Sequence, residues 1–158
     1  MIGSSTIHST FVIERDFKVP PEKVFASWAS VEAKRVWMSC DDAAVTQSFE
    51  MDFRPGGRET NSVAFPGGEM HRFDGYYLDI VPGRRIIYAF DMHVGAKRIS
   101  ASLATVVFEA QGSGTKMIFT EQIAFLDGYS DREERIRGTE IGLDKLQLSL
   151  MPDQNQTQ

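Results

Sequence analysis

The feature that most restricts the fold is a run of six strand-like segments between residues 44 and 126. They are rich in β-branched and aromatic residues and read AVTQSFEMDFR, RETNSVAF, EMHRFDGYYLDI, RRIIYAFDMH, RISASLATVVFEA and TKMIFTEQIAF. Between them lie the turn signals PGG, PGG, VPGR, HVGAK and QGSG. Because turns this short join antiparallel neighbours, the run is predicted to form an antiparallel meander.

A further strand and two short helices are predicted upstream of this run. The segment STFVIERDFKV alternates Phe11 and Ile13 with Val12 and Glu14, which is the period of a half-buried strand. After a double proline, PPEKVFASWASVEAKRVWMS changes to helical spacing, and a proline suits the first turn of a helix. The strand is therefore predicted to end at the prolines and to be followed by two short helices.

Downstream of the run, the period changes again to that of a long helix. Ser130 and Glu133 match a capping box, which predicts where this helix begins. The apolar residues on one face of the helix are Ile136, Leu143, Leu146 and Leu150. Residues 151–158 are polar and are predicted to form a disordered tail.

These elements predict a single α+β domain over residues 9–150. A seven-stranded antiparallel sheet is expected to wrap around the long C-terminal helix, because that helix is the only amphipathic element long enough to cover the sheet. Two short helices follow the first strand. A twisted sheet wrapped on one helix leaves a concave space, and such spaces are where ligand pockets form.

Charge and cysteine content exclude several kinds of partner and site. Seventeen basic and twenty-two acidic residues give a net charge of -5 without a basic cluster, so neither nucleic acid nor a membrane is expected as a partner. Cys40 is the only cysteine, which excludes an internal disulfide and a multi-cysteine metal site. The start MIGSSTIHST lacks the features of a secretory signal, so a cytoplasmic location is expected, and no cofactor is predicted.

Five strings, in this order, resemble a known family: PPEKVFASWASVEAKRVW, MDFRPGGR, FDGYYLDIVPGRRIIYAF, FEAQGSGTKMIFTEQ and GTEIGLDKLQLSL. The chain is similar to the START-like (SRPBCC) superfamily and, within it, to the AHSA-type group that resembles the C-terminal domain of the heat-shock-protein ATPase activator. The resemblance implies the helix-grip fold. It also implies a cavity, in which members of the superfamily carry lipids, hormones or polyketides, and a few members are cyclases or dehydratases.

Glu121 is the sharpest candidate for chemistry, because it stands in an apolar row. If residues 117–125 form a strand, Glu121 points the same way as Phe119 and Ile123. A carboxylate on an inward row either has a partner or has its pKa raised by desolvation. Glu121 is therefore predicted to contact a ligand, with acid or base catalysis as an alternative and a position at the sheet rim as another.

Histidine supplies a second candidate. His71 shares a row with Phe73 and Tyr77, and it could face Glu121 across the cavity if their strands lie side by side or opposite. The three histidines of the chain show no metal-ligand spacing, so no metal site is predicted. His93 is predicted to lie in a turn.

Aromatic and apolar residues on the same rows form the predicted wall of the cavity. The predicted ligand-binding residues are Trp37, His71, Phe73, Tyr77, Tyr88, Phe90, Met117, Phe119 and Glu121. For any one of the apolar residues, ordinary core packing is the alternative. As a set with two tyrosine hydroxyls and a carboxylate, they indicate polar groups that a bound molecule could satisfy.

The leading hypothesis is a domain that binds a small hydrophobic or amphipathic molecule between the sheet and the long helix. One alternative is a cyclase-, dehydratase- or hydrolase-type enzyme that uses Glu121 as acid or base. Another is a module for chaperone interaction or for forming a homodimer.

Overall fold

The computed structural model of the protein describes residues 4–38 and 45–151. Seven strands and three helices are assigned within these ranges, and helices and sheet together confirm the predicted α+β class. The elements in chain order are β1 (Thr6–Phe17), α1 (Pro21–Ala29), α2 (Val31–Trp37), β2 (Val45–Met51), β3 (Arg58–Ala64), β4 (Met70–Val81), β5 (Arg85–Val94), β6 (Lys97–Gln111), β7 (Gly114–Leu126) and α3 (Arg132–Ser149).

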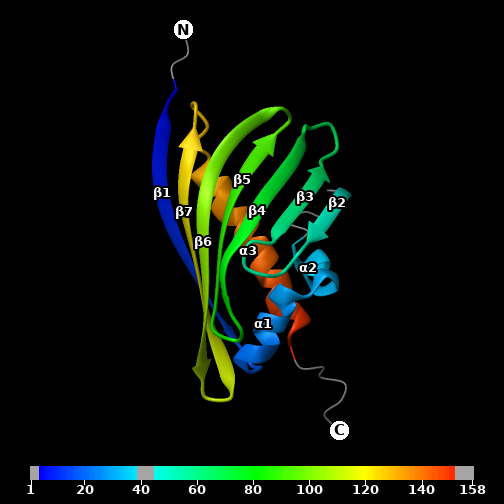
Figure 1. Cartoon of the computed structure of the whole chain (residues 1–158), viewed down its shortest axis with the longest axis vertical. Helices are drawn as coiled ribbons and strands as arrows, with labels where there is room; N and C mark the ends of the chain where they lie inside the picture. The colour runs from blue at the N-terminus through cyan, green and yellow to red at the C-terminus, as the bar shows by residue number, and fades with distance from the viewer. Residues whose placement is uncertain (1–3, 39–44, 152–158) are drawn as a thin grey trace.

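The strands form one antiparallel sheet in the order β1-β7-β6-β5-β4-β3-β2. Strands β2 to β7 are therefore the predicted meander, and β1 adds to its end beside β7, where Phe11 is opposite Glu121. Figure 1 shows this sheet curving around α3, with α1 and α2 near the end of the molecule where α3 finishes. Sheet and long helix make the predicted helix-grip arrangement.

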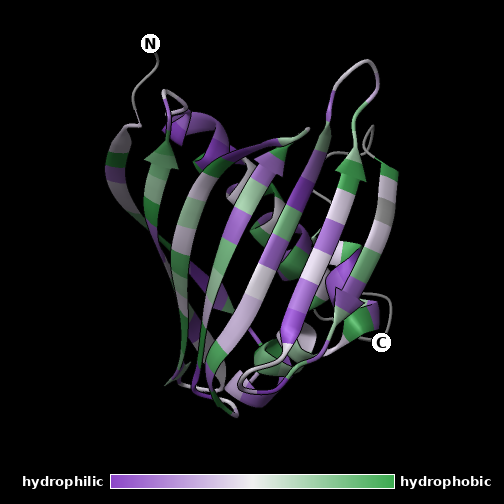
Figure 2. Ribbon diagram, turned by 45° about the horizontal axis from the view of Figure 1, so that its top comes forward, coloured by the Kyte–Doolittle hydropathy of each residue, from purple (hydrophilic) through white to green (hydrophobic). Residues whose placement is uncertain are grey.

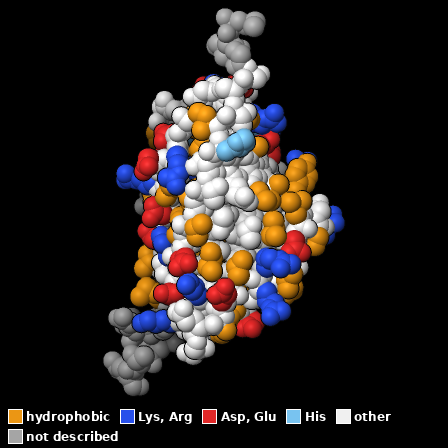
Figure 3. Space-filling model, turned by 90° about the vertical axis from the view of Figure 1, so that its left-hand side faces the viewer, with side chains coloured by type: hydrophobic (Ala, Val, Ile, Leu, Met, Phe, Trp, Pro, Cys, Tyr) orange, Lys and Arg blue, Asp and Glu red, His pale blue; other side chains and the backbone are white. Residues whose placement is uncertain are grey.

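Alternation of side chains decides which face of the sheet meets α3. Along β7, Met117, Phe119, Glu121, Ile123 and Phe125 are all buried, as the period of two predicts. Figure 2 shows the same alternation of hydrophobic and hydrophilic residues on other strands. In the side view of Figure 3, hydrophobic side chains on the surface lie in small groups among charged ones.

The two short helices are separate because Ser30 caps the second. Its backbone is extended, and its side-chain oxygen accepts a hydrogen bond from the Ala33 N–H at 3.2 Å. The long helix begins one residue later than the capping box predicted. Asp131, not Ser130, is the N-cap, because its carboxylate accepts from the Glu134 N–H at 3.1 Å.

Two sequence predictions fall partly or wholly outside the described residues. Cys40 lies in the segment 39–44, outside the described residues. Of the predicted tail, residues 151–158, the structure describes Met151 alone. Within the described ranges, no helix combines the length and the apolar character needed to cross a membrane.

Candidate functional site

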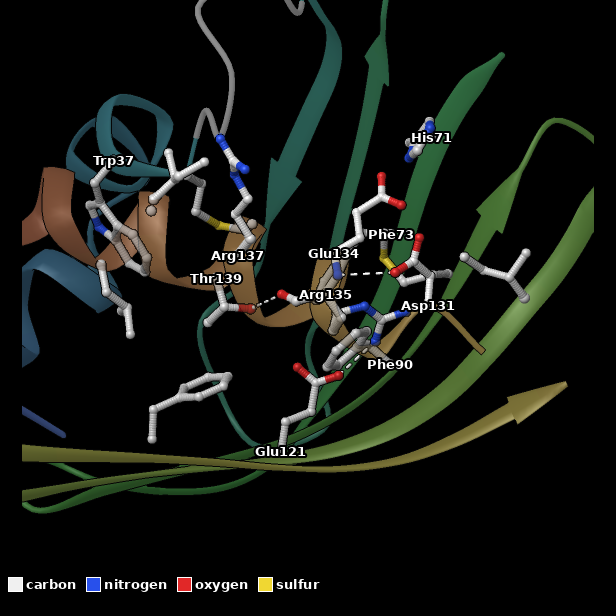
Figure 4. A pocket seen from close by; sticks show the side chains of 18 of the residues that line it. Trp37, His71, Phe73, Phe90, Glu121, Asp131, Glu134, Arg135, Arg137 and Thr139 are labelled. Atoms are coloured by element: carbon white, nitrogen blue, oxygen red, sulfur yellow. Dashed lines mark hydrogen bonds and ion pairs between the residues drawn. The ribbon is translucent and has the colours of Figure 1, made fainter. Parts of the chain in front are cut away.

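A cavity of about 380 Å³ lies between the inner face of the sheet and the helices α2 and α3. Figure 4 shows part of its lining, with β7 on one side and α3 on the other. The lining residues are Trp28, Lys34, Trp37, Met38, Phe65, His71, Phe73, Tyr88, Phe90, Met92, Ile99, Phe119, Glu121, Tyr129, Asp131, Glu134, Arg135, Arg137, Gly138, Thr139, Ile141, Gly142 and Leu143. The volume falls within the roughly 300–1,000 Å³ that is usual for small-molecule sites.

Most of the predicted ligand-binding residues line this cavity. They are Trp37, His71, Phe73, Tyr88, Phe90, Phe119 and Glu121. Tyr77 and Met117 are not in the described lining; both side chains are buried in the core. Helix α1 packs on β6 and on β7, the strand that carries Met117. The Tyr77 hydroxyl makes hydrogen bonds with the buried Lys34 and Glu59 side chains.

Glu121 is held on the floor of the cavity by an ion pair with Arg135. Its Oε2 accepts from Arg135 Nη1 at 2.6 Å and from the Ser102 hydroxyl at 2.9 Å, while Oε1 accepts no hydrogen bond from a described residue. Burial raises the pKa of Glu121 above its ordinary value of 4.5, and the nearby Arg135 partly opposes this shift. Both outcomes predicted for an inward carboxylate, a partner and a raised pKa, therefore occur together.

Arg135 reaches the sheet from α3, as Figure 4 shows. It also donates to the Ser100 hydroxyl at 2.6 Å, and its guanidinium lies 5.6 Å from the centre of the Phe125 ring. Arg135 was not among the residues predicted from the sequence. A signal was present, because Arg135, Thr139 and Gly142 are spaced four and three apart and so share one helical face.

A second buried ion pair joins α2 to β3. Lys34 Nζ lies 2.5 Å from Glu59 Oε1, and only 2% and 4% of the two side chains is exposed. The Tyr77 hydroxyl donates to the same Glu59 oxygen and lies 3.3 Å from Lys34 Nζ. Neither charged residue was predicted, although Lys34 is three residues from both Val31 and Trp37 on α2.

The cavity reaches the surface beside the start of α3, where Asp131, Glu134 and Arg137 are exposed. His71 also lines the cavity, and its ring packs against Phe65 with centres 4.6 Å apart. Burial lowers the pKa of His71 below its ordinary value of 6.5, and Glu69 opposes the shift. Strands β5 and β6 lie between His71 and Glu121, and no hydrogen bond between described residues joins the two.

A cluster of possible metal-binding groups lies on the opposite, outer face of the sheet. Asp74, Asp91 and His93 bring one ligand atom each within 4.8 Å of one another. Arg72 pairs with Asp74 at 2.7 Å, and Arg98 lies 3.8 Å from Asp91. The prediction that His93 lies in a turn is wrong, because ladder pairing continues through Val94 and the turn begins at Gly95.

Comparison with known proteins places the chain in a family. Residues 18–150 match the family described as Activator of Hsp90 ATPase homolog 1-like protein. A solved structure of an uncharacterised protein from Rhizobium leguminosarum is 54% identical, with a TM-score of 0.89, and the match covers 93% of this chain and 97% of that one.

Two further structures have the same fold. The Mll3558 protein of Rhizobium loti is 39% identical over 92% of this chain and 99% of that one, with a TM-score of 0.86. The CV1439 protein of Chromobacterium violaceum is 26% identical over 91% and 98%, with a TM-score of 0.79. No curated protein matches the chain. The family match spans most of the chain, and the chain therefore belongs to the family of Activator of Hsp90 ATPase homolog 1-like proteins.

Proposed function

We propose that the protein binds a small, mostly apolar molecule in the cavity between the sheet and α3. The observation that carries this proposal is a cavity of about 380 Å³ lined mainly by aromatic and aliphatic side chains. The cavity opens to the surface beside the start of α3, and a concave space of this size with a mostly apolar lining is typical of small-molecule sites. Charged and polar side chains also line it, and such groups can orient a ligand.

The cavity exists partly because α3 carries a glycine where a side chain would enter it. A Cβ atom placed at Gly138 would meet no atom within 4 Å, although Gly138 lines the cavity. Glycine weakens a helix interior by about 1 kcal/mol relative to alanine. This cost has no compensation from local packing, which fits a position kept open for a ligand.

Glu121 and Arg135 supply the orientation within this proposal. Their charges neutralise each other in a low-dielectric site, so neither needs a charged ligand as a partner. Glu121 Oε1 remains able to accept a hydrogen bond from a ligand hydroxyl or amide. We expect the ligand to be amphipathic, with its apolar part against the aromatic residues.

Filling the cavity tests the proposal. The probe is N-phenyl-1-naphthylamine, a neutral compound whose emission rises in apolar sites. The test variant is Gly138→Leu, which adds a side chain to the cavity without removing one. The control is Glu140→Leu, which adds the same side chain to an exposed position on the same helix. We expect the wild type and the control to bind the probe and Gly138→Leu to lose at least tenfold in affinity. Equal binding by Gly138→Leu would refute the cavity as the site.

Native mass spectrometry offers a second, independent test. The protein is purified from the expressing cells without added ligand, and its mass is compared with that of the denatured chain. We expect a non-covalent mass that is lost on denaturation, and Gly138→Leu should lack it. An unliganded mass in the wild type, together with unaltered probe binding in the filled variant, would contradict the proposal.

One observation favours acid–base catalysis as a second candidate. Glu121 combines an oxygen without a hydrogen-bond partner among the described residues with a raised pKa, and both suit a general base or acid. Incubating a ketone labelled with deuterium next to its carbonyl would test this, because a base in the cavity should wash out the label. The same rate of label loss with Glu121→Gln would refute the catalytic role of Glu121.

A further inference from the structure

Lys34 is a buried cation in the cavity lining that has no role in the proposed orientation of the ligand by Glu121 and Arg135. It is 2% exposed, yet it lines the cavity. Its Nζ lies 5.4 Å from the centre of the Trp28 ring and 5.7 Å from the centres of the Tyr77 and Tyr88 rings. Glu59 balances the charge, so this end of the cavity is an aromatic enclosure with a fixed ion pair in its wall.

Lys34 has one hydrogen-bond donor more than it uses within the described part of the chain. An ammonium group has three N–H donors. Glu59 Oε1 and the Tyr77 hydroxyl oxygen accept two of them, at 2.5 and 3.3 Å. The third N–H makes no hydrogen bond with a described residue, and a buried donor left in that state costs free energy.

Tyr88 provides a second donor in the same wall that has no hydrogen-bond partner among the described residues. Its side chain lines the cavity, and its hydroxyl makes no hydrogen bond with any described residue. Burial and the carboxylates of Glu59 and Glu121 all raise the pKa of Tyr88, so the hydroxyl keeps its proton and lies within the influence of both ion pairs. Two donors that a ligand oxygen could satisfy therefore lie at this end of the cavity.

The charges decide which acceptor fits. Where the cavity is buried, Lys34 is balanced by Glu59 and Arg135 by Glu121, so an anionic group placed there would bring an unmatched charge. The other charged side chains of the lining, Asp131, Glu134 and Arg137, are exposed at the cavity mouth. A neutral carbonyl oxygen has two lone pairs and brings no charge. We propose that the cavity selects neutral carbonyl compounds with an aromatic or alicyclic body, and that the carbonyl oxygen accepts from Lys34 Nζ with the Tyr88 hydroxyl as second donor. This inference rests on the proposed binding function and specifies its ligand class.

The test uses two probes, 2-acetonaphthone and 2-ethylnaphthalene, that differ only in having a carbonyl group or a methylene group beside the ring. Their affinities are measured by equilibrium dialysis, and the quantity compared between proteins is the ratio of the two dissociation constants. The ratio removes changes in cavity size that affect both probes alike. Because the free energy of each probe in water is the same for all the proteins, a change in the ratio reports a change in the contacts of the carbonyl oxygen within the cavity.

Three variants are compared with the wild type. Lys34→Met/Glu59→Gln removes the ammonium together with its counter-charge, so no unpaired charge is left to unfold the chain. Tyr88→Phe removes only a hydroxyl, and Tyr76→Phe is its control, because Tyr76 is exposed on the outer face of the sheet. Circular dichroism verifies that each variant is folded.

We expect the preference for the ketone to fall by about 10-fold to 100-fold in the double variant and by about 3-fold to 10-fold in Tyr88→Phe, and to remain unchanged in Tyr76→Phe. If both probes bind but neither cavity variant changes the ratio, the carbonyl inference is refuted while cavity binding stands. If neither probe binds the wild type, the binding function itself is refuted, and this inference with it.

Discussion

Breaking the buried Lys34–Glu59 pair from one side should destabilise the protein far more than removing both charges. Lys34→Met leaves the Glu59 carboxylate in a site where 4% of its side chain is exposed, with the Tyr77 hydroxyl as its one remaining donor among the described residues. One of its oxygens, Oε2, already lacks a hydrogen-bond partner in the described structure. Loss of one partner of a buried pair typically costs about 3–5 kcal/mol. Because the Lys34 and Glu59 side chains are only 2% and 4% exposed, solvent screens this pair little, and we expect a cost in that range.

Glu59→Gln should cost less than Lys34→Met, about 1–3 kcal/mol. The amide oxygen can still accept from the Tyr77 hydroxyl and from Lys34. The remaining ammonium is surrounded by three aromatic rings at 5.4–5.7 Å, and cation–π contacts in a desolvated site contribute up to about 2 kcal/mol. The double variant Lys34→Met/Glu59→Gln carries no unpaired charge, and we expect it to be more stable than Lys34→Met alone.

Urea denaturation followed by circular dichroism measures all four proteins of this double-mutant cycle. We expect a coupling free energy of about 2 kcal/mol or more between the two positions. The control is Arg54→Met, which breaks an ion pair whose side chains are 66% and 56% exposed, and which should change stability by less than about 1 kcal/mol. The reasoning is refuted if Lys34→Met costs no more than this control, or if the two single changes simply add.

Three further predictions concern other parts of the molecule. Burial raises the pKa of Glu121, so the contribution of this group to stability is present below its ordinary pKa of 4.5 and is lost as the pH rises through the folded-state pKa. Glu121→Gln should therefore gain stability relative to wild type as the pH rises above 4.5. Parallel pH profiles of the two proteins in urea denaturation would contradict this. Gly138→Ala should stabilise α3 by about 1 kcal/mol, and Gly142→Ala should fall short of that gain because its Cβ would lie 3.3 Å from the Trp37 carbonyl oxygen; equal melting temperatures would count against this packing. Thr115→Val should cost about 1–2 kcal/mol in chemical denaturation, because the buried Thr115 hydroxyl donates to a main-chain carbonyl at 2.7 Å, and an unchanged midpoint would show that this bond is dispensable.

Much of the fold could be predicted from local pattern. The period of two along β7 is enough to predict that Glu121 belongs to the inward row, and Glu121 is 2% exposed. Glycine turns predicted the meander, and the change to helical spacing predicted α1, α2 and α3. The predicted start of α3 was one residue off, because aspartate at position 131 caps a helix as well as serine at position 130 does.

The partners of the charged residues could not be predicted in the same way. Lys34 and Glu59 are 25 residues apart, and Arg135 and Glu121 are 14 apart on different elements. Spacing within one element shows which side chains share a face, but not which residue of another element lies opposite. Tyr77 was predicted to line the cavity for the same reason, since its row is inward, yet the Lys34–Glu59 pair engages its hydroxyl in the core.

Local pattern in the chain was therefore enough to specify the elements, the inward rows and the family resemblance, because hydrophobic period, turn residues and capping residues act over a few positions. Packing in three dimensions set the rest: two balanced ion pairs lie beside one cavity, α1 packs on β6 and β7, and Gly138 leaves space within the cavity. The physical reason is that ion pairs and cavities depend on how whole elements pack, and buried charges are stable only where that packing brings a partner within hydrogen-bond distance.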